Sequence, residues 1–512
     1  MFVVLALVLC LVSATVSGCA QEAAKPATPP KPVAPEVELK VAVSDDISNI
    51  DPAAAGIIAD RTVGQQIFEG LVTFDLKTYG IVPSLAEKWE VSPDGKTYTF
   101  YLRKGVMFQK GFGELTSADV KFSLERHLDP QVASRESVTF SNMDKVETPD
   151  KYTAKILLKN PEPGFMSALA WQSGFIVSEK AVKQFGKDFG LNPVGTGAYM
   201  FDSWVQKEKV VLKANDQYWG GKPQVTKVTI RIIPDETIAV QAVSSGEIDL
   251  VGVTQVSGFR AAKDVTNVDR LTAKSATINH IWLQTAKAPT NDIRVRKAIA
   301  YALDIPAMVK SIGDPIVDSP AILNPLCVGY TTEFTKYEHN LDKAKALIKE
   351  AKLPANAKLI IYYRRAQLFE PITLIVKEQL SKILPCELVQ LEAGIQAAKF
   401  REGEFNVGIW SVARLEADQM LLPYYLSTGA NNYAKWKNAE VDKLLNAGRV
   451  ELDPKKRAAN YEKVQQIIAD ELPVISAGLS MSLIVARKGI TGIQPHPFAG
   501  LIEYRKLTLP TK

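Results

Sequence analysis

The four histidines are the residues best suited to acid–base or metal chemistry, and they are scattered along the chain. A hydrolase needs a nucleophile beside a base, and a metal site needs several ligands close together. The chain has no Gly-x-Ser-x-Gly nucleophile elbow and no His-Glu-x-x-His pair. We therefore expect no catalytic residue, no cofactor and no bound metal. We interpret the isolated histidines as surface or packed residues: His127, His280, His339 and His496.

A pair of glycines gives the next pattern that is common in binding sites. Gly195 and Gly197 flank Thr196, but no third glycine follows, so the stretch does not form a dinucleotide-binding loop. Glycine adopts positive φ without steric cost, so we interpret the pair as a sharp turn that leads into a strand. The pattern that follows predicts a hairpin of the strands Ala198–Val205 and Val210–Ala214.

Three tryptophans next to polar residues indicate a binding cleft instead of a reactive centre. An indole offers a wide apolar face and one hydrogen-bond donor, which suits a cleft wall, although core packing explains each of them equally well. Trp410 stands out because it ends a predicted strand and opens the loop Ser411–Gln419. The three are Trp171 before Gln172 and Ser173, Trp282 after His280, and Trp410 before Ser411.

The chain that carries these residues is long and has an ordinary composition. It has 512 residues, more than one hydrophobic core usually serves, so we expect two or more lobes. Hydrophobic residues make up 46% and charged residues 23%, as in other globular proteins. The net charge is only +5 and no dense basic run contains interleaved aromatics, so we expect no nucleic-acid partner.

Strand and helix patterns alternate, which predicts an α/β fold. The strand Ile278–Leu283 is expected to cross between the lobes. The helix Asn291–Asp304 has an apolar stripe, and we expect Arg294, Arg296 and Lys297 to face water. The other main predicted strands are Val37–Val43, Lys227–Ile233, Leu359–Tyr363, Glu387–Leu391 and Asn406–Trp410, and the other main predicted helices are Asp235–Ser245, Leu341–Ala351 and Pro371–Leu384.

The N-terminus predicts export and a membrane anchor. Residues 2–16 are almost wholly apolar and suit the core of a signal peptide over residues 1–18, although no Lys or Arg precedes them, so we expect the true start codon upstream. Val16-Ser17-Gly18-Cys19 resembles a lipobox, so we expect a lipid on Cys19; a plain anchor helix is the alternative. Residues 19–36 are rich in proline and predict an extended tether of roughly 50 Å.

Two cysteines remain after processing, because Cys10 leaves with the signal segment and Cys19 carries the lipid. Cys327 and Cys386 form an even pair outside the cytoplasm, so a disulfide between them is one interpretation. Two separate thiols are an equally good interpretation, since spacing alone does not bring two Cα atoms within bridging distance.

The stretch around the glycine pair carries a resemblance to a known family. Pro193-Val194-Gly195-Thr196-Gly197-Ala198-Tyr199, with Asn215-Asp216-Gln217-Tyr218-Trp219 and Lys222-Pro223, resembles the signature of the family 5 extracellular solute-binding proteins. Ala198 stands where the family usually has proline. Further matches follow in the same order between Val37 and about Pro497: Gln65–Val72, Pro83–Trp89, Leu115–Ser123, Gly246–Leu250, Asn291–Asp304, Asn431–Tyr433, Glu440–Leu445 and Leu472–Ile475.

The resemblance implies an extracytoplasmic substrate-binding lipoprotein of an ABC importer for peptides or nickel. It implies a two-lobed periplasmic-binding-protein fold with a hinge: lobe I of residues 37–277 plus 479–512, with an inserted subdomain at about 81–190, and lobe II of residues 278–478. A monomer would close on a small solute and dock on permease subunits while its lipid holds it to a bacterial membrane, in the periplasm or at the cell surface. A ligand sensor or chaperone and a metal-chelate binder are the alternatives.

The resemblance also bears on the ligand. The family's peptide binders carry an aspartate three residues after the tryptophan at position 410, and it pairs with the peptide's ammonium group. This chain has Ala413 there, followed by Arg414. A guanidinium favours a carboxylate or phosphate, so one interpretation is an anionic ligand group near Arg414 in place of the usual peptide capture. An Arg414 that points to solvent, and a cationic ligand group near Glu416 and Asp418, are the alternatives. The expected ligand-binding residues are Asp45, Trp171, His280, Trp282, Trp410, Ser411, Arg414 and Tyr433.

Overall fold

The structure is a computed structural model that describes residues 36–365, 368–392, 394–498 and 500–510. The expected signal segment, the lipidated Cys19 and all of the tether except Glu36 lie outside the described residues. Lobe I and lobe II are used below as names for the two sets of residues defined above. None of the helices in the described part of the chain combines the length and the apolar content that crossing a membrane requires.

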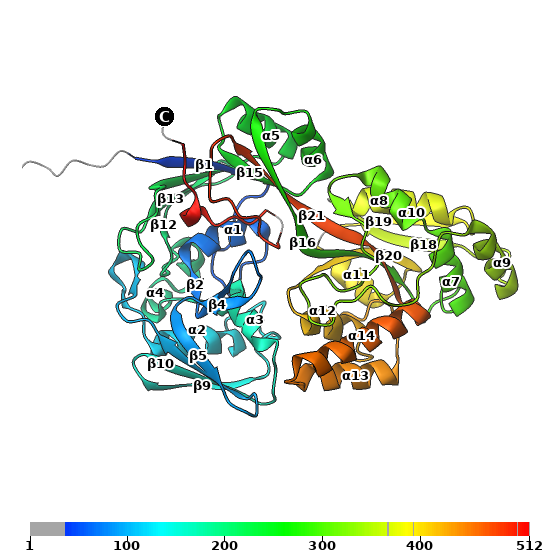
Figure 1. Ribbon diagram of the computed structural model, residues 1–512, viewed down its shortest axis with the longest axis horizontal. Coiled ribbons are helices and arrows are strands. Elements are labelled where there is room, and N and C mark those ends of the chain that lie inside the picture. Colours follow the sequence, from blue (N-terminus) through cyan, green and yellow to red (C-terminus); the bar gives the residue numbers. More distant parts are fainter. Residues whose placement is uncertain (1–35, 366–367, 393, 499, 511–512) are drawn as a thin grey trace, which may run out of the picture. The chain divides into compact units, whose positions relative to one another are not determined.

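One sheet of eleven strands contains strands of both lobes (Figure 1). The two long antiparallel strands β21 (Val474–Arg487) and β16 (Val268–Leu283) join its two parts. The short β17 (Ile316–Val317) pairs with β21. In lobe I the sheet order leading to β21 is β12 (Tyr199–Val205), β13 (Lys209–Ala214), β14 (Lys227–Ile232), β1 (Glu38–Val43) and β15 (Leu250–Val253); in lobe II β16 is followed by β20 (Val407–Ala413), β18 (Leu359–Arg364) and β19 (Cys386–Leu391).

The two crossing strands are irregular where they pass from one lobe to the other. Their register shifts between Lys274 and Ile278 and again between Asn279 and His280. Gly478 has φ 113°, a conformation that favours glycine. The Asn279 side chain holds this irregular point, because its Nδ2 donates to the Gly478 carbonyl at 3.2 Å.

The remaining strands and helices of lobe I surround its part of the sheet. A four-stranded sheet lies in the region of the expected subdomain, and three two-stranded ladders complete the lobe. The four-stranded order is β5 (Ala86–Val91), β6 (Thr97–Leu102), β10 (Thr153–Leu158) and β9 (Met143–Asp150); the ladders are β2 (Glu69–Gly70) with β11 (Phe175–Ile176), β3 (Val72–Phe74) with β4 (Ile81–Pro83), and β7 (Met107–Phe108) with β8 (Gly113–Glu114). The α-helices are α1 (Ile58–Ile67), α2 (Ser117–Glu125), α3 (Phe165–Ala170), α4 (Glu179–Phe185), α5 (Glu236–Ser245) and α6 (Val256–Lys263).

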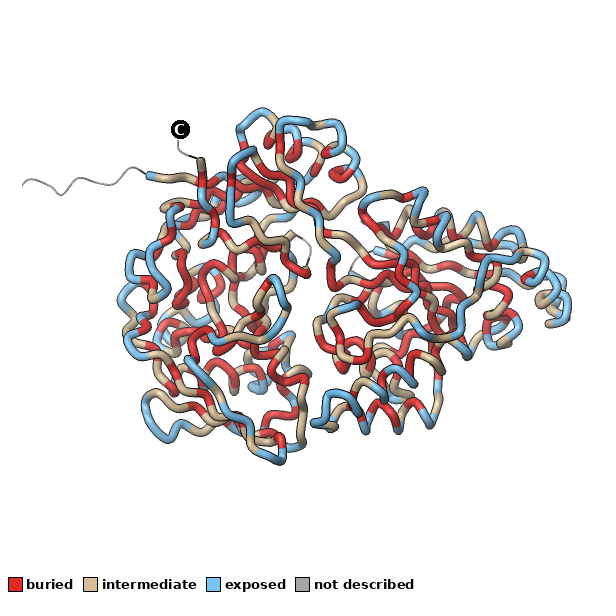
Figure 2. The backbone as a smooth tube through the Cα atoms, viewed as in Figure 1, coloured by how far each residue is buried: buried red, intermediate tan, exposed pale blue. Residues whose placement is uncertain are grey.

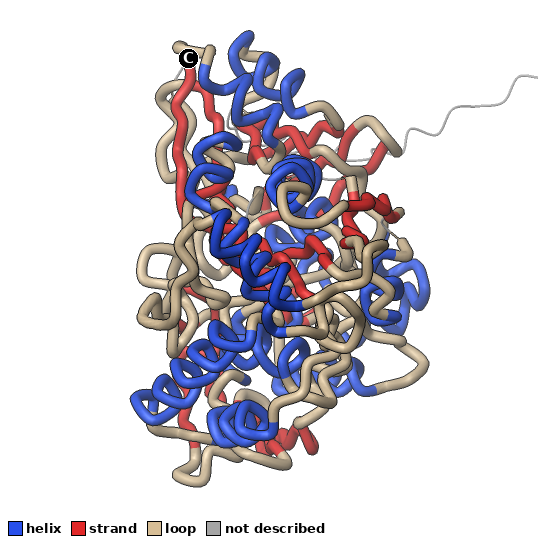
Figure 3. Tube along the Cα trace, turned by 90° about the vertical axis from the view of Figure 1, so that its right-hand side faces the viewer, coloured by secondary structure: helices blue, strands red, loops and turns tan. Residues whose placement is uncertain are grey.

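Lobe II is richer in helix, and Figure 3 shows helices in front of its strands. The predicted helix Leu341–Ala351 is observed with those bounds as α9, capped by the Asn340 side chain. The others are α7 (Ile293–Ala302), α8 (Ile305–Ile312), α10 (Phe369–Leu380), α11 (Gln396–Glu402), α12 (Ala417–Tyr425), α13 (Ala439–Val450) and α14 (Pro454–Glu471).

One expectation about α7 is wrong. Arg296 does not face water: only 6% of the residue is exposed. Its Nε donates to the Glu471 carbonyl at 2.8 Å and its Nη1 to the Thr290 carbonyl at 2.9 Å. Backbone carbonyls therefore satisfy the buried guanidinium.

The buried apolar side chains form four clusters, and each belongs to one side of the crossing strands. Two clusters draw on residues 39–268 and 483–509, and two on residues 278–479. The buried backbone segments in Figure 2 gather in the interior of each lobe accordingly. The last residues of the chain thus help to fill the core of lobe I.

Candidate functional site

The glycine-rich stretch proves to be a packing element. A Cβ on Gly195 would lie 2.1 Å from the Ile67 carbonyl oxygen, so only glycine fits against the end of α1. The backbone N–H of Gly197 donates to the same carbonyl at 2.8 Å. The Gln109 side chain donates to the carbonyls of Gly197 and Tyr199 at 3.0 and 2.8 Å. The stretch therefore joins α1 to the sheet of lobe I.

Glu69 explains the second part of the same stretch. Its carboxylate accepts hydrogen bonds from Tyr218 Oη at 2.8 Å, Trp219 Nε1 at 2.8 Å and Thr196 Oγ1 at 2.9 Å. Burial raises the pKa of Glu69, and these donors oppose that effect. A cavity of about 70 Å³ lies beside this cluster, lined by lobe I alone. The signature residues thus stabilise lobe I locally.

Two neighbouring cavities lie between the lobes. One, of about 90 Å³, is lined by Glu136, Ser167 and Trp171 of lobe I and by Arg414 of lobe II. The other, of about 150 Å³, is lined by residues such as Ile58 of lobe I and Ser411 of lobe II. The cavities share Arg61, Ala413 and Phe498. A solute held here contacts both lobes at once.

Arg61 and Arg414 approach the first of these cavities from opposite lobes. Arg61 comes from α1, and its guanidinium carbon lies 5.8 Å from the centre of the Trp171 ring. Burial lowers the pKa of Arg61, the nearby Arg414 lowers it further, and Glu136 opposes both effects. Neither arginine has an acidic partner within 4.0 Å among the described residues. Two like charges facing one enclosed space favour an anion between them.

Aromatic rings cover one side of the same space. The rings of Trp171 and Phe498 lie 4.1 Å apart between centroids and are tilted by 39°. Both line the cavity that holds Arg61. The site thus combines an apolar wall with a few charged groups, as small-molecule sites usually do.

The expected ligand-binding residues fall into two groups. Trp171, Ser411 and Arg414 line the interlobe cavities. The others line neither: Asp45 is exposed beside Ser44, Trp410 packs against Phe400 and Tyr433, and Trp282, His280 and Tyr433 are buried in lobe II.

The buried members of the second group correct the expectation of a cleft wall. Trp282 is fully buried, with its ring centroid 5.4 Å from that of Tyr425 and 5.6 Å from that of Tyr433. His280 is 1% exposed, and burial lowers its pKa to about 4, so the ring is neutral. They are core residues because β16 is covered on both faces within lobe II.

Sequence reasoning misses Arg61, Glu136 and Phe498. Arg61 stands in a helix without any unusual motif, and Glu136 in a loop of mixed composition. No local pattern marks them, because the cavity exists only when residues more than 350 positions apart meet. A buried charge without a partner is the signal in the structure, and a sequence does not contain it.

A larger cavity of about 450 Å³ lies within lobe II, lined largely by apolar residues of 300–339 and 465–476. The described residues that line it all belong to lobe II, so this cavity does not lie between the lobes. Groups of three or more potential metal ligands do not occur among the residues that the structure describes.

Cys327 and Cys386 are free thiols, which corrects the disulfide interpretation. Cys327 is buried, with its sulfur 3.5 Å from the Met420 sulfur and 3.9 Å from the Arg414 carbonyl. Cys386 stands at the start of β19, at the far side of lobe II's part of the sheet. β19 begins at Cys386, whereas Cys327 contacts the Arg414 carbonyl just after the end of β20. β18 lies between β19 and β20 in the sheet, so it separates the two thiols.

Comparisons with known proteins agree with this architecture. Residues 80–432 match the family described as bacterial extracellular solute-binding proteins, family 5 Middle. The glutathione-binding protein GsiB of Escherichia coli O1:K1 / APEC is 28% identical over 477 residues, which cover 90% of this chain and 93% of that protein.

Solved structures that share the fold include complexes with a ligand, among them the following two. One is MoaA from A. tumefacien R10 in complex with mannopinic acid, with a TM-score of 0.81, 26% identity and coverage of 93% of this chain and 100% of that chain. The other is the ABC transporter-associated periplasmic binding protein DppA from Helicobacter pylori in complex with the peptide STSA, with a TM-score of 0.79, 26% identity and coverage of 92% and 98%.

Proposed function

We propose that this chain, which belongs to the family 5 bacterial extracellular solute-binding proteins, captures a small solute that carries a carboxylate between its two lobes. Membership confirms the expected α/β periplasmic-binding-protein fold, an extracytoplasmic place of action and a binding protein instead of an enzyme. The observation that carries the proposed ligand class is Arg61, a largely buried guanidinium with no acidic partner among the described residues, which lines the interlobe cavities.

The physical argument is one of charge compensation. Removing a guanidinium from water is costly unless an anion pairs with it. Arg414 enters the same cavity from the other lobe and adds a second positive charge. A ligand carboxylate that bonds both arginines supplies the missing charge, and it contacts the two lobes together. Because it bonds both lobes only when they are close, its binding favours the closed arrangement.

The ligands of the relatives support a solute of this class. The relatives include a glutathione-binding protein, a protein solved with mannopinic acid and a protein solved with a peptide. Each of these ligands carries at least one carboxylate. The ligand of this chain is proposed to share that group, with the rest of the molecule against Trp171 and Phe498.

Delivery to a permease completes the proposed role. DppA is described as associated with an ABC transporter, and we assign the same kind of partner to this chain. We propose that the hinge lies at the irregular points of β16 and β21, a position supported by the contact between Asn279 and Gly478 there. The lobes are proposed to rotate about these two strands, as a monomer. Lipid attachment at Cys19 keeps the protein at the membrane; metabolic labelling that leaves Cys19 unmodified would exclude it.

Ligand titration of Arg61→Gln and Arg414→Gln tests the carboxylate site. The probes are glutathione and a mixture of dipeptides and tripeptides, measured by calorimetry. Each variant is expected to bind the probe that the parent protein binds about tenfold more weakly or worse, because it loses a charge-assisted bond. Arg231→Gln, which removes an exposed arginine paired with Glu247, is the control. Unchanged affinity in both variants would refute the proposed site.

A further inference from the structure

We propose that Glu136 receives a cationic group of the solute, so that the solute is a zwitterion with an ammonium group beside Glu136 and a carboxylate beside Arg61 and Arg414. This inference rests on the proposed function and adds a second, opposite charge to the ligand. Glu136 is the only acidic residue among the described residues that line the two interlobe cavities.

The charged residues that line the two cavities match the two opposite charges of such a ligand. The described lining residues include two arginines and one glutamate, but no lysine or aspartate. The Glu136 carboxylate has no cation within 4.0 Å in the described part of the chain, so Arg61 does not neutralise it by direct contact. A purely anionic solute would bring a like charge towards Glu136. A zwitterion gives every one of these charges an opposite partner.

The Glu136 side chain is held within the cavity wall. Its Oε2 accepts a hydrogen bond from Thr139 Oγ1 at 3.0 Å, and Thr139 lines the same cavity. Its backbone N–H donates to Ser134 Oγ at 3.1 Å. The other carboxylate oxygen remains available for a ligand. Among the described residues, lobe II contributes no carboxylate to the lining of this cavity, and position 413 is alanine.

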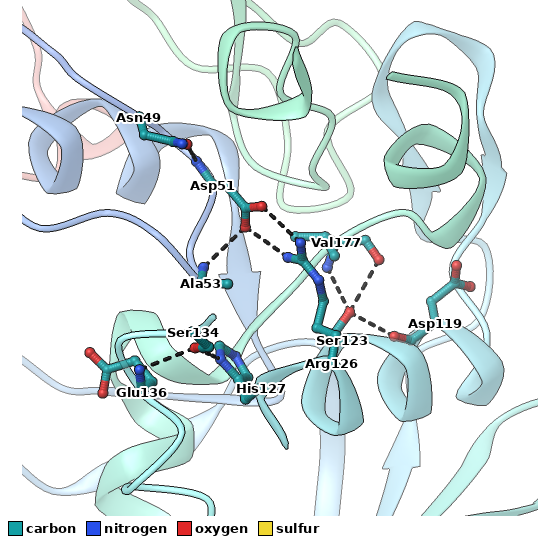
Figure 4. Close-up of polar contacts among 10 residues, drawn as sticks. All are labelled: Asn49, Asp51, Ala53, Asp119, Ser123, Arg126, His127, Ser134, Glu136 and Val177. Atoms are coloured by element: carbon teal, nitrogen blue, oxygen red, sulfur yellow. Dashed lines mark hydrogen bonds and ion pairs between the residues drawn. The ribbon is translucent and has the colours of Figure 1, made fainter. Parts of the chain in front are cut away.

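A polar network fixes the loop that carries Glu136 (Figure 4). At the base of the loop Arg126 forms two bonds to Asp51, Nη1 to Oδ1 at 2.7 Å and Nη2 to Oδ2 at 2.8 Å. Asp51 Oδ1 also accepts from the Ala53 backbone N–H at 3.0 Å. Both ions of the pair are largely buried, which makes the geometry of the contact rigid.

The second anchor of the loop is His127. Its Nδ1 lies 2.7 Å from Ser134 Oγ, the oxygen that accepts the Glu136 N–H, as Figure 4 shows. The His127 ring stacks on Phe140 with centroids 4.7 Å apart. The loop is thus fixed on both sides of Glu136. A carboxylate that is already in place when the ligand arrives loses little conformational entropy on binding.

The test compares two probes that differ only in the amine. One is the mixture of dipeptides and tripeptides, and the other is the same mixture after N-acetylation. The parent protein is expected to bind the free-amine mixture about tenfold more tightly or better, because acetylation removes the group that Glu136 receives. Glu136→Gln should lose this preference, because its affinity for the free-amine mixture falls while its affinity for the acetylated mixture does not change. Glu136→Asp should retain part of it.

Glu147→Gln is the matched control, since Glu147 is an exposed carboxylate on β9 that pairs with Lys145. Equal affinity of the parent protein for both mixtures, or a preference that survives in Glu136→Gln, would overturn the inference while leaving the carboxylate site intact. If neither mixture binds the parent protein, both proposals are overturned. If Glu136→Gln does not fold, the two probes on the parent protein decide the question.

Discussion

Ser167 of lobe I donates a hydrogen bond to Glu416 of lobe II, with 3.4 Å between Oγ and Oε2. Glu416 belongs to a buried ionic cluster, because Arg457 Nη2 lies 2.5 Å from its Oε1 and 2.6 Å from Asp418 Oδ2. The Tyr461 hydroxyl donates to Asp418 as well. The hydrogen bond between the lobes is therefore accepted by a carboxylate that an ion pair within lobe II holds in position.

Arg457→Met tests that cluster. The change removes the only cation bonded to Glu416 and Asp418 among the described residues, so two buried carboxylates lose their partner. We expect the free energy of unfolding to fall by about 3–5 kcal/mol. Urea denaturation measures it. Lys456→Met, at an exposed neighbour on α14, should change stability by less than about 0.5 kcal/mol. A loss of similar size in both variants would contradict the role of the cluster.

Buried histidines predict a loss of stability in acid. Burial lowers the pKa of His280 to about 4, whereas the unfolded ring titrates near 6.5. The unfolded chain therefore takes up the proton first, and stability falls as the pH drops through this window. Neither ring nitrogen is in hydrogen-bond geometry with a described partner, so His280→Phe removes the titration with little loss of bonding.

The measurement is urea denaturation of parent and variant between pH 7 and pH 4. The parent should lose about 3 kcal/mol more than His280→Phe over this range, since one pKa unit corresponds to about 1.4 kcal/mol. The contributions of the carboxylates cancel in the difference. His339→Gln, which changes an exposed histidine, should follow the parent. Identical pH profiles for parent and His280→Phe would show that folding does not lower the pKa of the His280 ring.

Gly195→Ala tests the packing of the glycine-rich stretch. The new Cβ would lie 2.1 Å from the Ile67 carbonyl oxygen, so α1 or the turn must move. We expect a destabilisation of about 1–3 kcal/mol in urea denaturation, the usual result of an overpacked interior. Gly394→Ala is the matched control, because nothing lies within 4 Å of a Cβ at that exposed position. Equal stability of the two variants would argue against the close approach.

Thiol titration tests the free cysteines. A chain that begins at Val37 retains only Cys327 and Cys386. After unfolding without reductant it should show two thiols that react with Ellman's reagent, whereas a disulfide would leave none. In the folded protein Cys327 should react far more slowly than Cys386, because it is buried and burial raises the pKa of its thiol well above the usual value.

Sequence reasoning predicts the elements whose patterns are local. The helix Leu341–Ala351 has an apolar stripe and an asparagine cap, and its bounds are predicted without error. The strand β16 is predicted only from Ile278, because residues 269–274 alternate between half-buried and exposed positions and lack the apolar run that follows Ile278. Patterns thus locate elements where one face or both faces are clearly apolar.

The site is harder to predict because it depends on contacts between distant segments. His280 pairs with Trp410 and Trp282 with Gly408 across β16 and β20, yet only Trp410 is partly exposed. The alternation of side chains along β16 does not distinguish a core residue from a site residue here, because both faces of β16 are covered. Arg61 and Glu136 are recognised as site residues only because they line the same cavity as Arg414, which belongs to the other lobe. Ser411 and Arg414 are found because they follow Trp410 closely in sequence, although β20 does not end at Trp410 as expected but continues to Ala413.

The return of the chain into lobe I has a consequence for synthesis and export. Leu250 of β15 pairs with Ala486 of β21, and Gln66 Nε2 donates to the Ile502 carbonyl at 2.9 Å. A growing polypeptide that has reached residue 470 lacks these partners. Lobe I is therefore translated first but completed last. The nascent protein stays incompletely folded until its last residues are made, and an incompletely folded chain is the form that passes through a secretion channel.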